Sequence, residues 1–199
     1  MPDRPSPIRP WEAVEAAIKY DCRLFSIRER RARSPRTGEL HDFWVIESCD
    51  WVNVIPITPD GDVVMVRQYR HGISESTLEV PGGMVDPEDE SPLEAARREL
   101  QEETGYASDE VTPLGWIHPN PATQNNRCYT FLARGAERRY DVRFEGTEET
   151  EVVLVPLAEI PELIQNGRIS HALVVVAFHR LLLAEGDVRS LWSGARGKS

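Results

Sequence analysis

The sequence predicts an α/β protein with one main domain preceded by a shorter element. Three observations lead to this fold class. The chain has 199 residues, of which 40% are hydrophobic, so it can bury a core of ordinary size. Short apolar runs bounded by turn residues predict strands. Longer segments between and after these runs predict helices, and one helix in the middle of the chain carries a dense set of carboxylates.

The first 48 residues are expected to form an N-terminal extension. Residues 1–10 are rich in proline and are expected to be frayed, and Trp11–Tyr20 is predicted to be a short helix. Arg23–Arg33 alternates apolar and polar residues as a strand does, and a Ser-Pro-Arg-Thr-Gly turn leads to a returning strand over His41–Ser48. This hairpin carries more apolar surface than an exposed edge tolerates well, in Phe43, Trp44, Val45 and Ile46. It is therefore expected to mediate a homodimer, and an appended hairpin on a monomer is the alternative.

Residues 49–193 are expected to form the main domain. Trp51–Pro59 and Val63–Tyr69 predict two strands joined by an Asp-Gly-Asp turn. The later elements are predicted strands over Val111–His118, Tyr129–Ala133 and Val152–Pro156, and predicted helices over Leu157–Asn166 and Ser170–Ala184. Residues 194–199 are expected to be a flexible tail.

Composition argues against several classes of protein, namely nucleic-acid binders, membrane proteins and secreted proteins. The net charge of -10 argues against a general binder of nucleic acid or of anionic membranes. The longest purely apolar run, residues 172–178, is too short to span a bilayer, and the first ten residues lack the apolar core of a secretory signal. The three cysteines are well separated and are interpreted as reduced thiols, so a cytoplasmic location is expected.

The stretch from Gly82 to Tyr106 predicts a turn, an acidic loop and a helix. Ser91 is a good N-cap, Pro92 suits the first helical position, and Glu94 completes a capping box with Ser91. Gly105 stands where a left-handed C-terminal cap is favoured. A buried stripe is expected from apolar residues at helical spacing, namely Leu93, Ala96 and Leu100.

Three carboxylates, Glu99, Glu102 and Glu103, fall on a neighbouring face of this helix. They repel one another, and they lie in the second half of the helix, where its dipole disfavours anions. Arg98 can offset part of this cost by pairing with Glu94 or Glu102. A divalent cation held by oxygen ligands would offset more, and Mg²⁺ commonly binds a few carboxylates together with substrate phosphates. For an isolated acidic helix, a merely solvated face would be the simpler interpretation.

The residues from Gly83 to Tyr106 resemble the Nudix hydrolase signature, whose second half is intact from Arg98 to Gly105. Two departures are present. Six residues instead of five separate Gly83 from Glu90, which puts the role of Glu90 in doubt, and Tyr106 replaces the usual aliphatic residue. The resemblance implies an α/β/α sandwich with a mixed sheet. It also implies Mg²⁺, or Mn²⁺, held by Glu99, Glu102, Glu103 and the carbonyl of Gly82, with Glu102 contributing to catalysis.

The segments around the signature resemble the ADP-ribose and nucleoside diphosphate sugar pyrophosphatase branch of this family. Residues 66–71 (VRQYRH) and 78–83 (LEVPGG) carry this likeness. It implies that Arg70 contacts substrate phosphates, although an Arg70–Glu79 structural ion pair is an alternative, and both roles are compatible. It also implies a substrate-side loop at Pro121, for which a stiff connector is the other interpretation.

Weaker candidates complete the expected site. The resemblance to this branch implies that the acidic loop over residues 144–151 supplies the general base, with Glu148 the best match and Glu149 the next, and a solvated loop is the alternative. Arg127 is a further candidate for substrate binding. Trp51 is a candidate for stacking on a nucleobase, and a core position is at least as consistent with its pattern.

The expected reaction is therefore metal-assisted hydrolysis of the pyrophosphate bond in ADP-ribose or a nucleoside diphosphate sugar, giving a nucleoside monophosphate and a sugar phosphate. The alternatives are a Nudix enzyme acting on nucleoside triphosphates, dinucleoside polyphosphates or coenzyme A, and a non-catalytic domain that senses a nucleotide. The intact glutamates of the helix argue against the sensor.

Overall fold

The computed structural model describes residues 8–22, 24–143 and 149–186. Contacts within the chain divide it into two compact units. The first contains residues 1–49 and 118–126, and the second contains residues 50–117 and 127–199. The expectations of a frayed N-terminal segment and of a flexible C-terminal tail fall wholly or largely outside the described residues.

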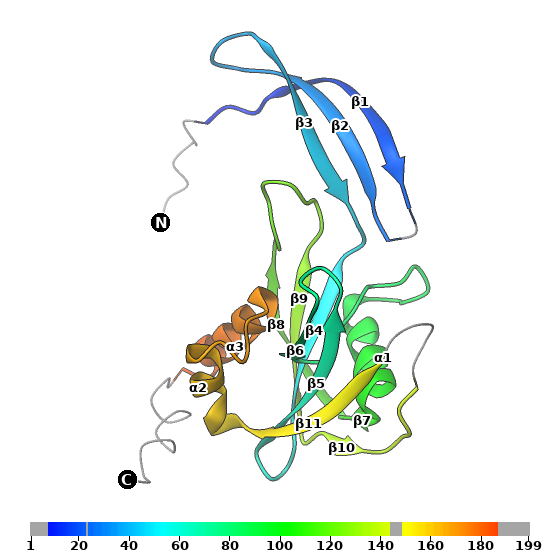
Figure 1. Ribbon diagram of the computed structural model, residues 1–199, viewed down its shortest axis with the longest axis vertical. Helices are drawn as coiled ribbons and strands as arrows, with labels where there is room; N and C mark the ends of the chain where they lie inside the picture. Colours follow the sequence, from blue (N-terminus) through cyan, green and yellow to red (C-terminus); the bar gives the residue numbers. More distant parts are fainter. Residues whose placement is uncertain (1–7, 23, 144–148, 187–199) are drawn as a thin grey trace. The chain divides into compact units, whose positions relative to one another are not determined.

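The first unit is built on an antiparallel sheet of three strands, β1 (Glu12–Asp21), β2 (Ser26–Arg33) and β3 (Leu40–Glu47), in that order (Figure 1). The predicted helix over Trp11–Tyr20 is therefore wrong. An isolated ten-residue helix is marginal in water, whereas β1 satisfies its backbone by pairing with β2 along almost its whole length. Cross-strand charges support this pairing, since Lys19 lies 2.7 Å from Glu29.

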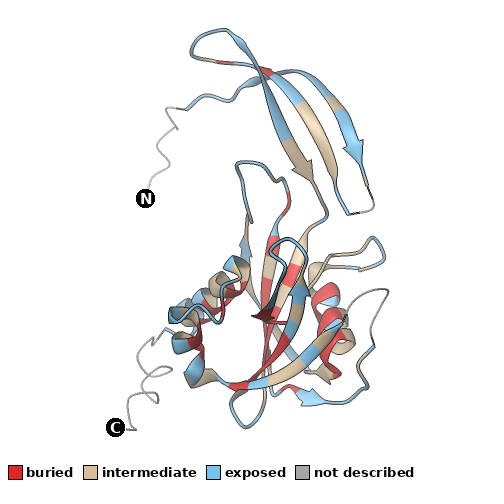
Figure 2. Ribbon diagram, in the orientation of Figure 1, coloured by how far each residue is buried: buried red, intermediate tan, exposed pale blue. Residues whose placement is uncertain are grey.

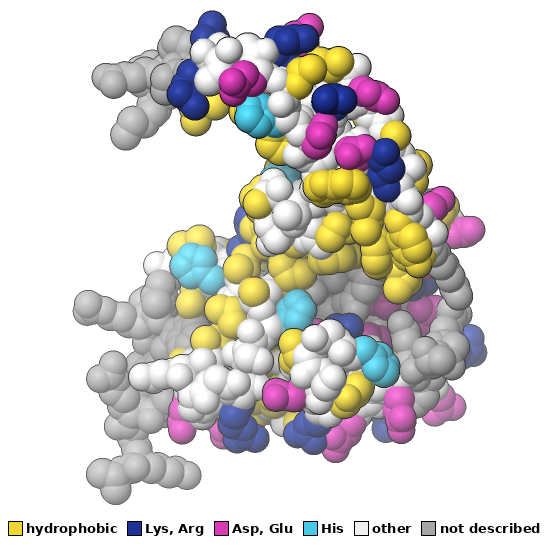
Figure 3. All heavy atoms as spheres, turned by 45° about the horizontal axis from the view of Figure 1, so that its top comes forward, with side chains coloured by type: hydrophobic (Ala, Val, Ile, Leu, Met, Phe, Trp, Pro, Cys, Tyr) yellow, Lys and Arg dark blue, Asp and Glu magenta, His cyan; other side chains and the backbone are white. Residues whose placement is uncertain are grey.

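This sheet has little interior of its own. Figure 2 shows its strands mostly exposed or half-buried, and Ala32 is the buried apolar residue of its strands among those described. Apolar side chains lie among charged ones on its surface (Figure 3). The exposed apolar residues come from both faces of the sheet and include Val14, Ile18, Tyr20, Leu40, Phe43 and Trp44.

The second unit contains a mixed sheet in the order β11-β5-β4-β9-β8, with β6 also paired to β5. Its strands are β4 (Trp51–Ile57), β5 (Asp62–Arg70), β6 (Glu75–Glu79), β8 (Glu110–Ile117), β9 (Cys128–Arg134) and β11 (Thr150–Pro156). The β4–β9 pair is parallel and the other pairs are antiparallel. The predicted mixed sheet is confirmed.

Helices cover both faces of this sheet, as an α/β/α sandwich requires (Figure 1). Successive side chains of a strand point to opposite faces, so Val52 and Val54 of β4 pack against α1 (Pro92–Thr104), while Ile55 packs into the other core. That second core is completed by α2 (Ile160–Gln165) and α3 (Ala172–Glu185). The predicted helices after β11 are confirmed, with a short 3₁₀ turn, η1 (Leu157–Glu159), before α2.

Two short strands, β7 (Tyr106–Ala107) and β10 (Glu137–Arg138), pair beside the C-terminal end of α1. At the outer edge of the main sheet, β8 contains Pro113 and a register shift before Gly115, whose φ is 110°. Arg180 of α3 donates hydrogen bonds to the carbonyls of Leu114 and Trp116 on either side of this irregularity. Within the described ranges, no helix is long and apolar enough to cross a membrane.

Candidate active site

The helix α1 begins and ends as its local sequence predicts. The hydroxyl of Ser91 accepts a hydrogen bond from the Glu94 backbone N–H, and Pro92 occupies the first turn. Gly105 adopts the left-handed conformation, and its N–H donates to the Gln101 carbonyl at 2.8 Å. The apolar stripe of the helix faces the sheet, with Ala96 and Leu100 buried. This packing fixes the direction in which the acidic face points.

Two of the three predicted carboxylates are buried beside a glycine turn. Glu99 and Glu103 are 9% and 7% exposed, and the Gly82 N–H donates to Oε2 of Glu103 at 2.9 Å. A Cβ at Gly83 would lie 2.4 Å from Oε1 of Glu99, and a Cβ at Gly82 would lie 2.2 Å from the Val52 carbonyl oxygen. Glycine is needed at both positions because the backbone must approach the carboxylates and β4 this closely.

The third carboxylate joins this group through Arg98. The Nη1 atom of Arg98 donates to Glu99 at 2.9 Å and to Glu102 at 3.1 Å. The predicted Arg98–Glu102 pair is therefore present, whereas Glu94 lies near Arg97 instead. Asp89 and the other acidic neighbours raise the pKa of Arg98, which stays protonated. One cation thus offsets part of the like-charge repulsion on α1.

The acidic loop before α1 supplies a further partner of Arg98. Asp89 accepts hydrogen bonds from Nε and Nη2 of Arg98 at 3.1 and 2.9 Å, whereas Glu90 is exposed. The same Arg98 hydrogen bonds hold the pKa of Asp89 below its ordinary value. The sequence analysis did not identify Asp89, although five residues separate it from Gly83, which is the spacing that the signature gives on that side.

The donors present suit a hard divalent cation. Carboxylate oxygens and a closely approaching backbone are ligands that Mg²⁺ accepts, and burial concentrates their negative charge. In the described part of the chain, no three acidic, histidine or cysteine side chains are already arranged around a common point as metal ligands. Hydrogen bonds from Arg98 and the Gly82 N–H occupy oxygens of the three glutamates. Metal binding at these residues would therefore replace hydrogen bonds that the carboxylates now accept.

Arg70 and Glu79 form a bidentate ion pair. Nε and Nη2 of Arg70 each donate to a carboxylate oxygen of Glu79 at 2.7 Å, and the Thr77 hydroxyl donates to the same carboxylate. Burial acts to raise the pKa of Glu79, but the hydrogen bonds from Arg70 and Thr77 outweigh it and keep the pKa below its ordinary value. The predicted structural pair is present, and 41% of the Arg70 side chain remains exposed. Thr77 was not identified from the sequence.

The acidic segment after β10 is anchored to the last turn of α1 at both ends. The Arg143 N–H donates to the Glu102 carbonyl at 2.9 Å, and the Thr150 hydroxyl donates to the Glu103 carbonyl at 3.2 Å. Glu149 is exposed and directly precedes Thr150. Glu148, the first candidate for the base, lies outside the described residues. The described residues on either side of 144–148 are thus hydrogen-bonded to the helix that carries the carboxylates.

The other predicted substrate-binding residues, Trp51, Arg127 and Pro121, lie outside α1. Trp51 is half-buried at the start of β4, next to Cys128 of β9. The guanidinium of Arg127 lies 4.6 Å from the centre of the Trp116 ring and donates to the Tyr129 hydroxyl. Pro121 is exposed in the loop that groups with the N-terminal sheet. Trp51 also forms an isolated β-bridge with Met84, whose carbonyl accepts a hydrogen bond from Arg98.

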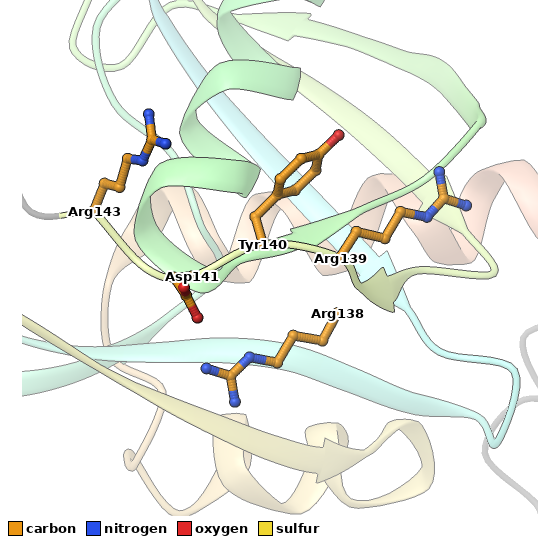
Figure 4. Close-up of a pocket in the computed structure, with 5 residues that line it drawn as sticks. All are labelled: Arg138, Arg139, Tyr140, Asp141 and Arg143. Atoms are coloured by element: carbon orange, nitrogen blue, oxygen red, sulfur yellow. The ribbon is translucent and has the colours of Figure 1, made fainter.

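A pocket of about 550 Å³ lies beside the C-terminal end of α1 and is lined by Arg138, Arg139, Tyr140, Asp141 and Arg143 (Figure 4). The three arginine side chains leave the segment in different directions instead of converging. Arg139 is also paired with Asp109. Because the cations point apart, this pocket is a weaker candidate for chemistry than the acidic face of α1.

Comparisons with known proteins identify the domain that contains these residues. A model of the NUDIX domain matches residues 50–178. An ADP-ribose pyrophosphatase of Bacillus subtilis is 29% identical over 135 residues, which cover 67% of this chain and 72% of that protein. An ADP-ribose pyrophosphatase of Mycobacterium tuberculosis is 25% identical over 186 residues, covering 91% of this chain and 89% of that protein.

The fold is also similar to that of a protein of known structure. A crystal structure of an ADP compounds hydrolase superimposes with a TM-score of 0.79, covering 91% of this chain and 98% of that chain at 22% sequence identity. This likeness supports the sandwich, and the family model supports the identity of the domain that contains α1. Since the matched model covers more than half of the sequence, the chain belongs to the family of Nudix hydrolases.

Proposed function

We propose that this protein hydrolyses the pyrophosphate bond of ADP-ribose or of a nucleoside diphosphate sugar, with Mg²⁺ as the cofactor and Mn²⁺ as a substitute. The observation that carries the proposal is the cluster of Glu99, Glu102 and Glu103 against the Gly82–Gly83 turn. The names of the two relatives described above support the substrate class. The products would be a nucleoside monophosphate and a sugar phosphate.

The carboxylates of Glu99, Glu102 and Glu103, with the Gly82 carbonyl, would hold the metal. When bound, Mg²⁺ neutralises phosphate charge and activates water. A water oxygen attacks one phosphorus, the bond from that phosphorus to the bridging oxygen breaks, and the bridging oxygen leaves with the other phosphate. The water's proton passes to a carboxylate, for which Glu148, Glu149 and Glu102 are the candidates. Burial of the cluster strengthens each of these electrostatic interactions.

Arg70 is the proposed clamp for the two phosphates. Its bidentate bond to Glu79 fixes the plane of the guanidinium, and the exposed part of the side chain can reach a ligand. Glu79 therefore acts as a positioning residue for Arg70. Pro121, Arg127 and Trp51 are further proposed substrate contacts. Trp51 forms a β-bridge with Met84, directly after the Gly82–Gly83 turn, so it is the one of the three that the contacts place near the carboxylates.

A substrate panel tests this function. ADP-ribose and hexose-linked ADP and GDP are compared with nucleoside triphosphates, dinucleoside polyphosphates and coenzyme A, in Mg²⁺, in Mn²⁺ and in EDTA, by separating the released nucleotides. We expect sugar-linked diphosphates to exceed triphosphates at least about tenfold in kcat/KM, a difference of about 1.4 kcal/mol. Faster cleavage of a triphosphate would overturn the substrate class. No cleavage of any compound would favour a nucleotide sensor.

We also infer that the protein is a cytoplasmic homodimer formed through the β1–β3 sheet. The sheet lacks its own core and leaves large apolar side chains exposed, including Trp44 at 53%. Sedimentation at tens of micromolar should give twice the chain mass, and Trp44→Glu should shift the protein toward monomer. Leu183→Glu is the matched control, because Leu183 is also a large exposed apolar residue, at 67%, but lies on α3. A monomeric wild-type protein would contradict the inference.

A further inference from the structure

Thr77 occupies a buried position beside the Arg70–Glu79 pair. It lies on β6, where it is 5% exposed, and it is paired directly with Gln68 of β5. Successive side chains of a strand alternate between its faces, so Thr77 and Glu79 project from the same face of β6. Arg70 is paired with Glu75, so its side chain has to extend along β6 to reach Glu79. The register of the two strands therefore holds the threonine next to the ion pair.

The Thr77 hydroxyl and Arg70 share one oxygen of Glu79. Oε1 of Glu79 accepts from the Thr77 hydroxyl at 2.5 Å and from Nε of Arg70 at 2.7 Å, while Oε2 accepts from Nη2 of Arg70. The hydroxyl oxygen is 3.4 Å from the Gln68 carbonyl oxygen, so Glu79 is its closer acceptor. Burial raises the pKa of Glu79, and the hydrogen bonds from Arg70 and Thr77 lower that pKa to a greater extent, so the carboxylate stays charged.

The three side chains differ in exposure, and this difference separates their roles. The side chain of Glu79 is 4% exposed, whereas that of Arg70 is 41% exposed. A ligand can therefore contact Arg70, while Thr77 and Glu79 support the arginine from the interior. The last side-chain torsion of a glutamate has a broad minimum, so a carboxylate held by Arg70 alone could rotate and take the guanidinium with it. A second donor on Oε1, held in place by a strand, restrains that rotation.

We propose that Thr77 is a positioning residue of the substrate site, and that its hydroxyl orients Glu79 so that Arg70 presents a fixed guanidinium to the two phosphates of a nucleoside diphosphate sugar. Thr77 acts through Glu79 and does not contact the substrate. The inference rests on the proposed function, in which Arg70 is the phosphate clamp. Pre-organisation of this kind lowers the cost of ordering the arginine when the substrate binds, so its loss weakens binding. The chemical step depends on the carboxylates of α1 and is left unchanged.

Kinetics and binding of ADP-ribose test the role of Thr77. KM and kcat are measured in Mg²⁺, and the dissociation constant of ADP-ribose is measured by calorimetry in EDTA. Thr77→Val keeps the shape of the side chain but removes the hydroxyl. This variant should raise KM and the dissociation constant about 5- to 10-fold and leave kcat within about twofold of the wild type. Thr77→Ser keeps the hydroxyl and should stay within about twofold of the wild type in all three quantities.

Thr130→Val is the matched control, because Thr130 is also buried, at 2%, but lies on β9, which does not neighbour β6 in the sheet. Its KM and kcat should change by less than about twofold. Circular dichroism confirms the folding of each variant, and Thr77→Ala takes the place of Thr77→Val if the valine variant folds poorly.

A second background tests whether Thr77 acts through Glu79. If it does, Thr77→Val should have little further effect on KM in a protein that already carries Glu79→Gln. An equal rise of KM in both backgrounds would overturn the proposal, as would a wild-type KM in Thr77→Val. If Thr77→Ser raised KM as much as Thr77→Val, the methyl group and not the hydroxyl would be important, and the proposal would be wrong.

The same measurements distinguish this inference from the proposed function. If the wild-type protein neither binds nor hydrolyses ADP-ribose or hexose-linked ADP and GDP, the proposed function fails. If the wild-type protein hydrolyses one of these compounds and Thr77→Val matches it in KM, the function stands and only the role of Thr77 fails.

Discussion

The helices α1 and α3 cover opposite faces of one sheet, but they do so with different chemistry. The buried residues of α3 are all apolar, namely Val174, Ala177, Phe178 and Leu181. By contrast, α1 buries the carboxylates Glu99 and Glu103, and it has no basic residue in its last turn. A buried charge costs several kcal/mol unless hydrogen bonds and opposite charges offset it. An apolar helix such as α3 covers the sheet without that cost, so we expect the chemistry to take place on α1.

The largest expected effect tests the functional side of this comparison. Glu103→Gln should lower kcat by about 10³-fold or more, on the order of 4 kcal/mol, because the cradle loses a metal-binding charge while the packing of α1 is unchanged. Steady-state kinetics in Mg²⁺ and a thermal melt measure the two quantities. Glu94→Gln, on the exposed first turn, is the control and should change kcat by less than about twofold. Normal turnover by folded Glu103→Gln would remove Glu103 from the site.

The next effect belongs to α3 and concerns stability. Phe178 is 1% exposed in the larger core, so Phe178→Ala should lower the free energy of unfolding by about 3–5 kcal/mol. Urea denaturation measures this loss, and kcat per folded molecule should stay within about twofold. Leu183→Ala, at an exposed position of the same helix, should cost less than about 0.5 kcal/mol. If Phe178→Ala lost more kcat than its unfolded fraction accounts for, α3 would also contribute to activity, and the contrast between the two helices would be wrong.

A smaller effect is expected in the acidic segment anchored to α1. We expect Glu148→Gln to lower kcat about 10²-fold, as removal of a general base does. A larger effect of Glu149→Gln would mean that Glu149, and not Glu148, is the base. Glu151 of β11 serves as the control because it pairs with Arg67 of β5, and Glu151→Gln should be nearly neutral. The measurement is kcat as a function of pH. If both Glu148→Gln and Glu149→Gln have small effects, the general base is instead a residue of α1, where Glu102 is the candidate.

The smallest effect compares the starts of the two helices. Ser91 caps α1, whereas His171, the residue at the N-cap position of α3, makes no side-chain cap hydrogen bond. Ser91→Ala should therefore lower the free energy of unfolding by about 1 kcal/mol, and Ser170→Ala, just before α3, should leave it nearly unchanged. Denaturant midpoints give both values. Equal losses at the two serines would mean that the cap is not what distinguishes these ends.

Local chemistry made α1 and the main strands predictable. Ser91, Pro92 and Gly105 define the ends of the helix within a few residues, and alternating apolar residues define β4 and β5. The segment of β1 was predicted wrongly, because its alanines and glutamates favour a helix locally and its true partner, β2, is visible only in the fold.

The candidate site was predictable where its residues share one helix. Glu99, Glu102 and Glu103 followed from the helical period and the signature. Thr77 and Thr150, which contact Glu79 and the end of α1, could not be predicted in this way. Their hydroxyls reach these partners only after strands far apart in the sequence have paired. Asp89 was missed for a different reason. The loop length was measured back from Arg98 rather than forward from Gly83, and an insertion makes the two counts disagree.

The irregular strand β8 has a consequence for solubility. It is an edge of the main sheet, and an edge that offers a regular row of donors and acceptors can recruit a strand from another molecule. Pro113 offers no N–H, the shift before Gly115 breaks the row, and Arg180 occupies the carbonyls of Leu114 and Trp116. Replacing Arg180 would therefore expose acceptors on this edge, and its side chain protects the folded protein from edge-to-edge aggregation as well as joining α3 to the sheet.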